Sequence, residues 1–425
     1  MDPSINRPVW LASGLRTPFT RVDGGLAGRD AITLGVPVLQ AMAVRASGRI
    51  DCAAWGSVIP NLGYSNLARE IWLEAGIDPT VPTWTVIMQC STSMMGAFNV
   101  AGVVGGGGAE LGLAGGSESM THIQTGLGQS LSDKLRRIAG ARDVSRRMKA
   151  ILKLRPGDFR LQVQSIKNRA TGKSMGEHSE ETAKEWGIGR EEQDALALES
   201  HRRAVAGQDR GFFKDLIIPV DGVERDAFPR RDTTLEALSR LPLSFDRTSG
   251  RGTATAGNSS PLTDGAAALW VASERGLARL PPSTPRARLV DFELGAVDIQ
   301  KEGLLMAPAY SIPRLLARNN LKYTDVGLWE IHEAFSAQVL YQLKALDSPD
   351  FLKNKAKVDA PLGTVPRERL NPNGGSVALG HPFGATGARI LSQAVKELAE
   401  RPKGSRALVS ICADGSVGTV ALLES

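Results

Sequence analysis

Four short segments of the 425-residue chain each carry one side chain able to transfer a proton or form a covalent bond: Cys90, His332, His381 and Cys412. A thiolate is a strong nucleophile, and an imidazole transfers protons near neutral pH. Two thiols and two imidazoles are therefore the groups needed to form and break a carbon–carbon bond through a thioester.

Cys90 follows an apolar run, 83–88, that predicts a buried strand ending at Gln89, and it precedes a helix predicted over 92–104. At a helix N-terminus the helix dipole favours the thiolate and lowers the pKa of the thiol. A single cysteine is more often a small buried apolar residue, so a purely structural Cys90 is the alternative.

The other three residues also stand at strand ends or turns. Cys412 follows an apolar strand and precedes a glycine-containing turn, while His381 lies in a segment rich in glycine, where core packing explains a histidine poorly. His332 follows the predicted strand 328–331. A buried strand-end residue remains the alternative for Cys412, and a histidine satisfied by a structural hydrogen bond remains the alternative for His332.

Apolar runs alternate with helical periodicity in two successive series, which predicts an α/β fold with a largely buried sheet and an internal duplication. In the first series we expect strands at 8–13, 83–88, 110–116 and 267–272 and helices at 31–46 and 92–104. In the second we expect strands at 287–292, 328–331, 374–379 and 406–411 and helices at 312–319, 335–345 and 387–400.

Residues 121–250 differ from both series because they are charged, helix-rich and poor in strand signals. Such a stretch is typical of an inserted functional loop or lid. The proline-rich segment 280–286 marks the boundary between the halves. The predicted organisation is an N-terminal half over 1–120, an inserted loop domain over 121–250, the continued N-terminal half over 251–282, and a C-terminal half over 283–425.

The net charge of +6 is unevenly distributed, because residues 134–160 contain ten basic and two acidic side chains. A solvated helical face is the simplest interpretation, and a phosphorylated cofactor or an acidic membrane surface are the competing ones. We expect no nucleic-acid partner, because neither stacking aromatic residues nor a known module accompanies the charge.

The chain has three cysteines and no CxxC pair, so neither a disulfide framework nor a four-thiolate metal site is expected. Reduced thiols, the lack of an export signal and the lack of a long apolar segment together predict a cytoplasmic protein.

Six motifs in order along the chain resemble those of the thiolase family: Cys90-Ser-Thr-Ser, Met175-Gly-Glu-His, Thr253 to Ala267, His332-Glu-Ala-Phe, Gly380-His-Pro-Phe-Gly-Ala-Thr-Gly and Cys412-Ala-Asp-Gly. The His-Glu-Ala-Phe form and the basic segment are similar to the thiolase subunit of fatty-acid oxidation trifunctional complexes. The resemblance implies a five-layered αβαβα core of two halves, and CoA-dependent cleavage of 3-ketoacyl-CoA to acetyl-CoA and a shortened acyl-CoA.

The resemblance also implies roles. His381 takes the proton of Cys90, which becomes the acyl-carrying nucleophile, and Cys412 exchanges protons with the acetyl-CoA carbanion and with CoA. His332, with a water, stabilises the enolate oxygen, while backbone N–H groups of Cys90 and of the Cys412 loop stabilise the tetrahedral oxyanion.

For binding, the resemblance implies coenzyme A as a cosubstrate, with Ser260 near its pantetheine arm and Arg230 near its nucleotide; an ordinary surface arginine is the equal alternative for Arg230. It implies no permanent cofactor and no metal. The expected partners are acyl-CoA and CoA, a second copy in a homodimer or dimer of dimers, a hydratase/dehydrogenase subunit, and peripheral membrane contact through the basic segment.

Asp414 departs from the family pattern, which has a small residue there, and its carboxylate could raise the pKa of Cys412 or disturb the oxyanion pocket. Three alternatives remain: a biosynthetic acetoacetyl-CoA thiolase, a decarboxylating condensing enzyme of the ketosynthase or hydroxymethylglutaryl-CoA synthase type, and a noncatalytic acyl-CoA carrier or scaffold. Cys412 argues against the second, and the four intact reactive residues argue against the third.

Overall fold

A ten-stranded mixed β-sheet forms the centre of the computed structural model, which describes residues 7–165 and 167–425. The main path runs β10-β11-β12-β9-β1-β8-β5-β3-β4, and β2 pairs with β8 beside it. The strands are β1 (Val9–Arg16), β2 (Thr20–Arg21), β3 (Cys52–Gly56), β4 (Thr83–Thr85), β5 (Leu111–Glu118), β8 (Thr263–Ala272), β9 (Arg286–Ala296), β10 (Leu328–Ile331), β11 (Arg406–Ala413) and β12 (Val417–Glu424).

The path has two matching halves that run outward from one antiparallel pair, β1 against β9. The first half continues β8-β5-β3-β4 and the second continues β12-β11-β10. In each half the strands next to the centre are antiparallel, and β3–β5 and β10–β11 are parallel. A parallel bridge from Trp329 to Leu370 extends the second half where β4 extends the first. The same order in both halves indicates a duplicated unit.

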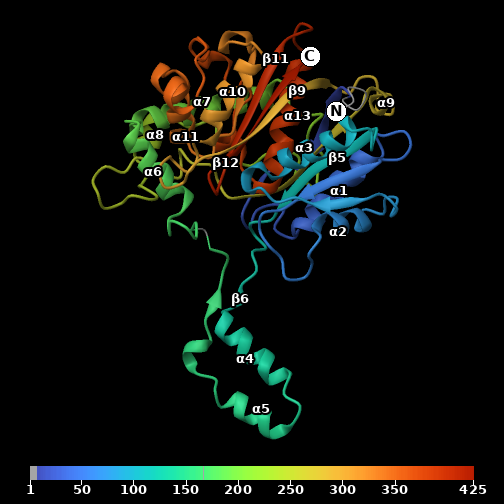
Figure 1. Cartoon of the computed structure of the whole chain (residues 1–425), viewed down its shortest axis with the longest axis vertical. Helices are drawn as coiled ribbons and strands as arrows, with labels where there is room; N and C mark the ends of the chain where they lie inside the picture. Colours follow the sequence, from blue (N-terminus) through green and yellow to red (C-terminus); the bar gives the residue numbers. More distant parts are fainter. Residues whose placement is uncertain (1–6, 166) are drawn as a thin grey trace.

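Helices form three layers around these strands (Figure 1). The central layer is α3 (Thr92–Gly105) and α13 (Thr386–Ala399), which contact each other; α3 packs on β3, β5 and β8, and α13 reaches strands of both halves. The outer layers are α1 (Ala31–Ala43) with α2 (Leu67–Glu74), and α10 (Ala307–Arg318) with α11 (Ser336–Leu346). The two halves of the sheet form the two strand layers, and the central helices pack against both of them. This order of layers confirms the predicted five-layered αβαβα fold.

Three apolar clusters fill the spaces between the layers. One joins Met94 of α3 and Leu391 of α13 to both halves of the sheet, and it includes Cys90. The other two lie under the outer helices, around Trp72 in the first half and around Tyr341 in the second, where Cys412 also belongs. The two reactive thiols therefore lie in the apolar interior, close to where the central layer meets the sheet.

The insertion has two parts. Residues around α4 (Gln129–Ala139) and α5 (Val144–Ile151), closed by the short pair β6 (Gly126–Leu127) and β7 (Leu161–Gln162), project from the body as an arm (Figure 1). The rest packs on the second half through α6 (Met175–Glu185) and α7 (Arg190–Asp209), which contact α11. The remaining short elements are α8 (Leu235–Ser239), α9 (Glu274–Leu277), α12 (Ser376–Leu379), the 3₁₀ turns Gln89–Ser91, Pro156–Asp158, Tyr323–Asp325, Arg367–Arg369 and Phe383–Ala385, and a π turn at Phe351–Lys355.

Two local predictions were wrong. The strand expected over 83–88 and ending at Gln89 stops at Thr85, and residues 376–379 form the helix α12 instead of a strand. That helix is stabilised from outside its own sequence, because the carboxylate of Glu333 accepts the Val377 N–H at 3.2 Å and the hydroxyl of Ser200 accepts the Gly375 N–H at 3.0 Å. Strands β3 and β12 were not predicted.

Candidate active site

Cys90 lies in a tight turn between β4 and α3. Its neighbour Gln89 has φ of 49°, a left-handed conformation that is costly for a residue with a side chain. Thr92 holds this turn: its hydroxyl accepts the Met88 N–H at 2.9 Å and donates to the Gln89 carbonyl at 2.7 Å. The turn places the buried thiol two residues before Thr92, the first residue of α3.

His381 reaches the thiol from the second half of the chain. Its Nε2 lies 3.2 Å from Cys90 Sγ, and its backbone N–H donates to the Thr263 hydroxyl at 2.9 Å. Gly380 has φ of 99°, and a Cβ there would lie 2.9 Å from the ring of Phe228, so only glycine permits this approach. The histidine is thus within hydrogen-bonding distance of the proton that it would remove.

Glu118, in the first half of the chain, binds the loop that contains His381. This residue was not singled out from the sequence. Its buried carboxylate accepts the Gly384 N–H at 3.0 Å, the Ser57 hydroxyl at 2.6 Å, and the N–H groups of Val58 and Ile59 at 2.9 Å each. The signal was a charged residue at the end of an apolar strand, where burial requires hydrogen bonds to the charge.

His332 lies at the end of β10, with its ring centroid 4.3 Å from that of His381. Its Nδ1 contacts the hydroxyl of Ser376 at 2.9 Å. Its Nε2 is buried and has no hydrogen-bond partner among the described residues. A buried imidazole nitrogen without a partner is costly, and beside a reactive thiol it suggests a place for a substrate atom.

Glu333 contacts the residues on both sides of Ser376, Gly375 and Val377, and was not singled out from the sequence. Its carboxylate accepts the hydroxyl of Ser200 at 2.7 Å and the side-chain N–H of Asn371 at 2.7 Å. A Cβ on Gly375 would lie 2.2 Å from Glu333 Cδ, so glycine at this position is required by close approach. The paired glycines 374–375, which the sequence placed in a predicted strand, therefore lie in a tightly packed turn before α12.

Cys412 lies near the end of β11, paired with Gly418 of β12. The same hairpin contacts the Cys90 turn, because Ser91 Oγ donates to the Ile411 carbonyl at 3.3 Å and accepts from the Thr419 hydroxyl at 3.1 Å. Burial, followed by the negative charge that Cys90 would carry, raises the pKa of Cys412 well above its ordinary value. The two thiols therefore share one electrostatic environment.

The resting state of the site is neutral. Burial, reinforced by the Asp414 carboxylate, raises the pKa of Cys90 to about 12, although the backbone N–H groups of Cys90 and Asp414 oppose the shift. Burial and the charge of Arg389 lower the pKa of His381 to about 3. The expectation that a helix N-terminus would lower the thiol pKa overall was wrong, because desolvation outweighs the hydrogen bonds from these N–H groups.

Asp414 lies in the turn after β11, half-buried, where its carboxylate accepts the Gly415 N–H at 2.7 Å and the Asn168 side-chain N–H at 3.3 Å. Its negative charge raises the pKa of Cys90 and does not contribute to the raised pKa of Cys412. The sequence had led us to expect an effect on Cys412. Its backbone N–H and that of Cys90 both favour negative charge on the Cys90 sulfur, so they form a pair of donors suited to an oxyanion.

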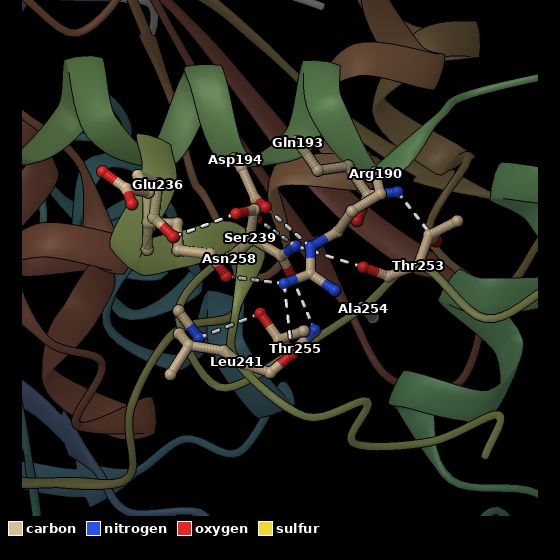
Figure 2. A network of polar contacts seen from close by, with 12 residues as sticks. Arg190, Gln193, Asp194, Glu236, Ser239, Leu241, Thr253, Ala254, Thr255 and Asn258 are labelled. Carbon is tan, nitrogen blue, oxygen red and sulfur yellow. Dashed lines mark hydrogen bonds and ion pairs between the residues drawn. The ribbon is translucent and has the colours of Figure 1, made fainter. Parts of the chain in front are cut away.

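Ser260 is half-buried and lies beside the His332 segment, because its N–H donates to the Ala334 carbonyl at 3.0 Å. The loop before it is anchored by a polar network (Figure 2) in which Asp194 accepts the Asn258 amide at 2.9 Å and the Arg190 guanidinium at 2.7 Å. Gln193 donates to the Thr253 hydroxyl at 2.8 Å in the same network. These contacts fix a loop that the sequence indicated only by its small residues.

Arg230 lies apart from the four reactive residues. It is exposed, and its backbone N–H contacts His201 Nδ1 at 3.3 Å. Its neighbour Phe228 packs on Gly380, so Arg230 stands on the outer side of the His381 loop. This position is compatible with contact to an anion outside the buried site.

Three of the reactive side chains form the donor set of a possible metal site. Cys90, His332 and His381 offer a sulfur and two nitrogens that lie within 4.8 Å of one another. Thiolate and imidazole are ligands that Zn²⁺ accepts. The expectation of a metal-free site stays a prediction.

The fold and site define a duplicated α/β protein with a buried cysteine–histidine centre equipped for acyl transfer. Thiolase N-terminal and C-terminal domains match residues 9–275 and 283–425. The 3-ketoacyl-CoA thiolases of Pectobacterium carotovorum and Yersinia enterocolitica are 37% and 34% identical, over 98% of this chain and 96% of each of theirs.

Solved structures agree with this match. The acetyl-CoA acetyltransferase of Bacillus anthracis superimposes with a TM-score of 0.82 at 30% identity, over 99% of both chains. The human mitochondrial 3-ketoacyl-CoA thiolase superimposes with a TM-score of 0.81 at 27% identity, over 99% of this chain and 100% of that one. The Ascaris suum Acat5 thiolase in complex with coenzyme A gives 0.80 at 27%, with the same coverage. The chain belongs to the thiolase family.

Replacing Asp414 tests its influence on the nucleophile. Asp414→Asn removes the charge that raises the pKa of Cys90 and retains the backbone N–H, so the pKa should fall and the thiolate fraction at a fixed pH should rise. The rate of Cys90 alkylation by iodoacetamide, followed against pH, should therefore increase. Asp209→Asn, a change of equal charge at an exposed position, is the control. An unchanged profile in Asp414→Asn would show that solvent screens this carboxylate.

Proposed function

We propose that this protein is a 3-ketoacyl-CoA thiolase that cleaves 3-ketoacyl-CoA with coenzyme A to acetyl-CoA and an acyl-CoA shortened by two carbons. The main observation is the 3.2 Å contact between His381 Nε2 and Cys90 Sγ in a buried site with His332 and Cys412 beside it. The thiolase match over both halves of the chain, and relatives named 3-ketoacyl-CoA thiolase, support the same reaction.

In the first half-reaction, His381 Nε2 takes the proton of Cys90 as the sulfur attacks the ketone carbon of the substrate. The tetrahedral oxyanion accepts hydrogen bonds from the N–H groups of Cys90 and Asp414. The bond between C2 and C3 then breaks, its electron pair passes to C2 and the thioester oxygen, and Cys412 gives its proton to C2. Acetyl-CoA leaves, and the shortened acyl group remains on Cys90.

In the second half-reaction, the Cys412 thiolate takes the proton of the CoA thiol. The CoA sulfur attacks the acyl-Cys90 carbonyl, and the Cys90 sulfur leaves and recovers its proton from His381. Every proton returns to its starting group. A high pKa suits Cys412 for this work, because its thiolate is basic enough to remove a proton from carbon or from sulfur.

The neighbouring assignments belong to the same proposal. Coenzyme A is a cosubstrate and no cofactor is permanently bound; Ser260 lies near its pantetheine arm and Arg230 near its phosphates. We further propose a role in fatty-acid β-oxidation, a cytoplasmic location, a homodimer or dimer of dimers, and association with a hydratase/dehydrogenase subunit. The thiolase from Ascaris suum that was crystallised in complex with coenzyme A supports coenzyme A as the cosubstrate.

Three other functions compete with this one. A biosynthetic acetoacetyl-CoA thiolase would use the same four residues and differ in preferred chain length and direction. A noncatalytic carrier or scaffold would not require the Cys90–His381 contact, which therefore argues against it. The retained Cys412 also argues against a decarboxylating condensing enzyme.

Turnover should depend on two of the three cysteines. Cys90→Ala should abolish CoA-dependent loss of 3-ketoacyl-CoA, and Cys412→Ala should lower kcat by about 10²–10⁴-fold, the usual contribution of a general acid or base. Cys52→Ala is a matched control, because Cys52 is an equally buried cysteine on β3. Activity measured with acetoacetyl-CoA and with a long-chain substrate would separate the two thiolase types. Binding of acyl-CoA without turnover by the wild-type protein would instead favour a carrier.

The arm presents a basic and apolar surface. Helix α5 exposes Val144 and Met148, and its C-cap residue Leu152 continues the same helical spacing; their exposed fractions are 78%, 50% and 78%. Ten basic side chains lie between residues 134 and 160. Among the described residues, no helix is long and apolar enough to cross a membrane. We propose that the arm lies against an anionic lipid surface, because its charge and its apolar stripe suit the headgroup region.

Vesicle flotation tests this contact. The full-length protein should float with vesicles that contain phosphatidylglycerol and stay behind with neutral phosphatidylcholine or at high salt. Leu152→Glu should weaken flotation, because it puts a negative charge in the apolar stripe. Val44→Glu, a similarly exposed position at the end of α1 on the body, should not. Equal flotation of both variants and the wild type would contradict the proposal.

A further inference from the structure

The two histidines of the site are oriented by different hydroxyl groups. His381 Nδ1 lies 2.7 Å from Thr386 Oγ1, and His332 Nδ1 lies 2.9 Å from Ser376 Oγ. A neutral imidazole donates from one nitrogen and accepts at the other, and a hydroxyl has a single hydrogen to donate. The other partner of each hydroxyl therefore determines which nitrogen of its histidine carries the proton.

Thr386 acts as an acceptor toward His381. Its hydroxyl donates to the Pro382 carbonyl at 3.2 Å, one turn earlier in the chain, so its hydrogen is engaged. The short contact to His381 Nδ1 then requires that Nδ1 carry the proton and donate it to Thr386. This leaves the lone pair on Nε2, the nitrogen 3.2 Å from Cys90 Sγ. His381 is thereby held in the form that can remove the thiol proton.

Ser376 acts as a donor toward His332. Its hydroxyl oxygen accepts from Arg389 Nη2 at 2.6 Å, and a guanidinium can only donate. Among the described residues its other contact is His332 Nδ1, so the serine hydrogen points to that nitrogen. Nδ1 then carries the lone pair and Nε2 carries the hydrogen. That N–H belongs to a buried nitrogen with no hydrogen-bond partner in residues 7–165 and 167–425.

We propose that Thr386 and the Arg389–Ser376 pair are positioning residues that hold the two adjacent histidines in opposite tautomers, His381 as a base and His332 as a hydrogen-bond donor. The inference rests on the proposed function, because a donor at His332 Nε2 meets the thioester oxygen where enolate charge develops.

The setting of the pair supports its roles. Arg389 is buried, and burial lowers its pKa to about 10, while the carboxylates of Glu330 and Glu333 oppose the shift; the guanidinium remains charged near neutral pH. Burial, His381 and this charge lower the pKa of His332 well below its ordinary value, so His332 stays neutral and keeps a defined tautomer. The same charge lowers the pKa of His381.

The rates of two reactions report on the two histidines separately. Alkylation of Cys90 by iodoacetamide needs His381 as a base and involves no enolate. Exchange of the acetyl-CoA methyl hydrogens in D₂O needs Cys412 and a donor to the enolate oxygen, and does not need proton removal from Cys90. Ser376→Ala should lower exchange by about 10²-fold and leave alkylation unchanged. Thr386→Val should lower alkylation by about 10²-fold and leave exchange unchanged.

Conservative variants provide the control. Ser376→Thr and Thr386→Ser keep the hydroxyl and should restore the rate that the apolar variant loses. A parallel loss of both rates in both variants, or no recovery with the conservative variants, would overturn the inference. If wild-type protein shows no CoA-dependent turnover, the proposed function itself fails; if it turns over and the variants do not separate the two rates, only the inference fails.

A direct measurement needs no variant of the positioning residues. Nitrogen-15 chemical shifts of the full-length protein distinguish a protonated from an unprotonated imidazole nitrogen, with resonances assigned from His332→Asn and His381→Asn. We expect a protonated Nδ1 in His381 and a protonated Nε2 in His332. The same tautomer in both histidines would overturn the inference even if an apolar variant failed to fold.

Discussion

The structure depends on a backbone contact between the two halves that only glycine allows. A Cβ on Gly116 would lie 2.0 Å from the Gly384 carbonyl, and a Cβ on Gly387 would lie 2.4 Å from Met94 N. These contacts bring the start of α13 against the start of α3, so the His381 loop of one half rests on the Cys90 turn of the other. The buried carboxylate of Glu118 fixes the same contact by accepting the Gly384 N–H. If these glycines carried side chains, the two backbones would move apart, and Cys90 and His381 would lose their contact.

Burial then decides how the site behaves. The same desolvation raises the pKa of Cys90 and lowers that of His381, so neither group is charged before a substrate arrives. In this neutral site, Cys90 stays a thiol and His381 stays an uncharged imidazole until a substrate binds beside them. In the proposed reaction, charge that develops on the substrate would meet fixed donors, namely the N–H groups of Cys90 and Asp414 and the buried Nε2 of His332, which has no partner among the described residues. In such an interior, preorganised donors are worth more than in water.

Sequence patterns predicted the layers, because apolar runs and helical periodicity reflect local burial, and the family resemblance was confirmed. The wrong predictions have different causes. The α12 segment is helical for a tertiary reason, because Glu333 and Ser200 supply its first hydrogen bonds. Strand β4 ends early for a local reason, because the Thr92 hydroxyl holds the turn before α3 through Met88 and Gln89. Glu118 carried one local signal, a charged residue at the end of an apolar strand. Ser376, Thr386 and Arg389 carry none, because their roles arise only when distant segments meet. The domain division at residues 120, 250 and 282 and the roles of Cys90, His332, His381, Cys412, Ser260 and Arg230 stay predictions.

The central claim is that one thiol, Cys90, carries the acyl group while Cys412 only moves protons. Rapid quenching of wild-type protein with a 3-ketoacyl-CoA in the absence of free CoA, followed by peptide mass spectrometry, tests it most directly. The account predicts one equivalent of released acetyl-CoA and an acyl group of the shortened length on the peptide that contains Cys90. An acyl group on Cys412 or Cys52, or release of acetyl-CoA without any acylated cysteine, would contradict it.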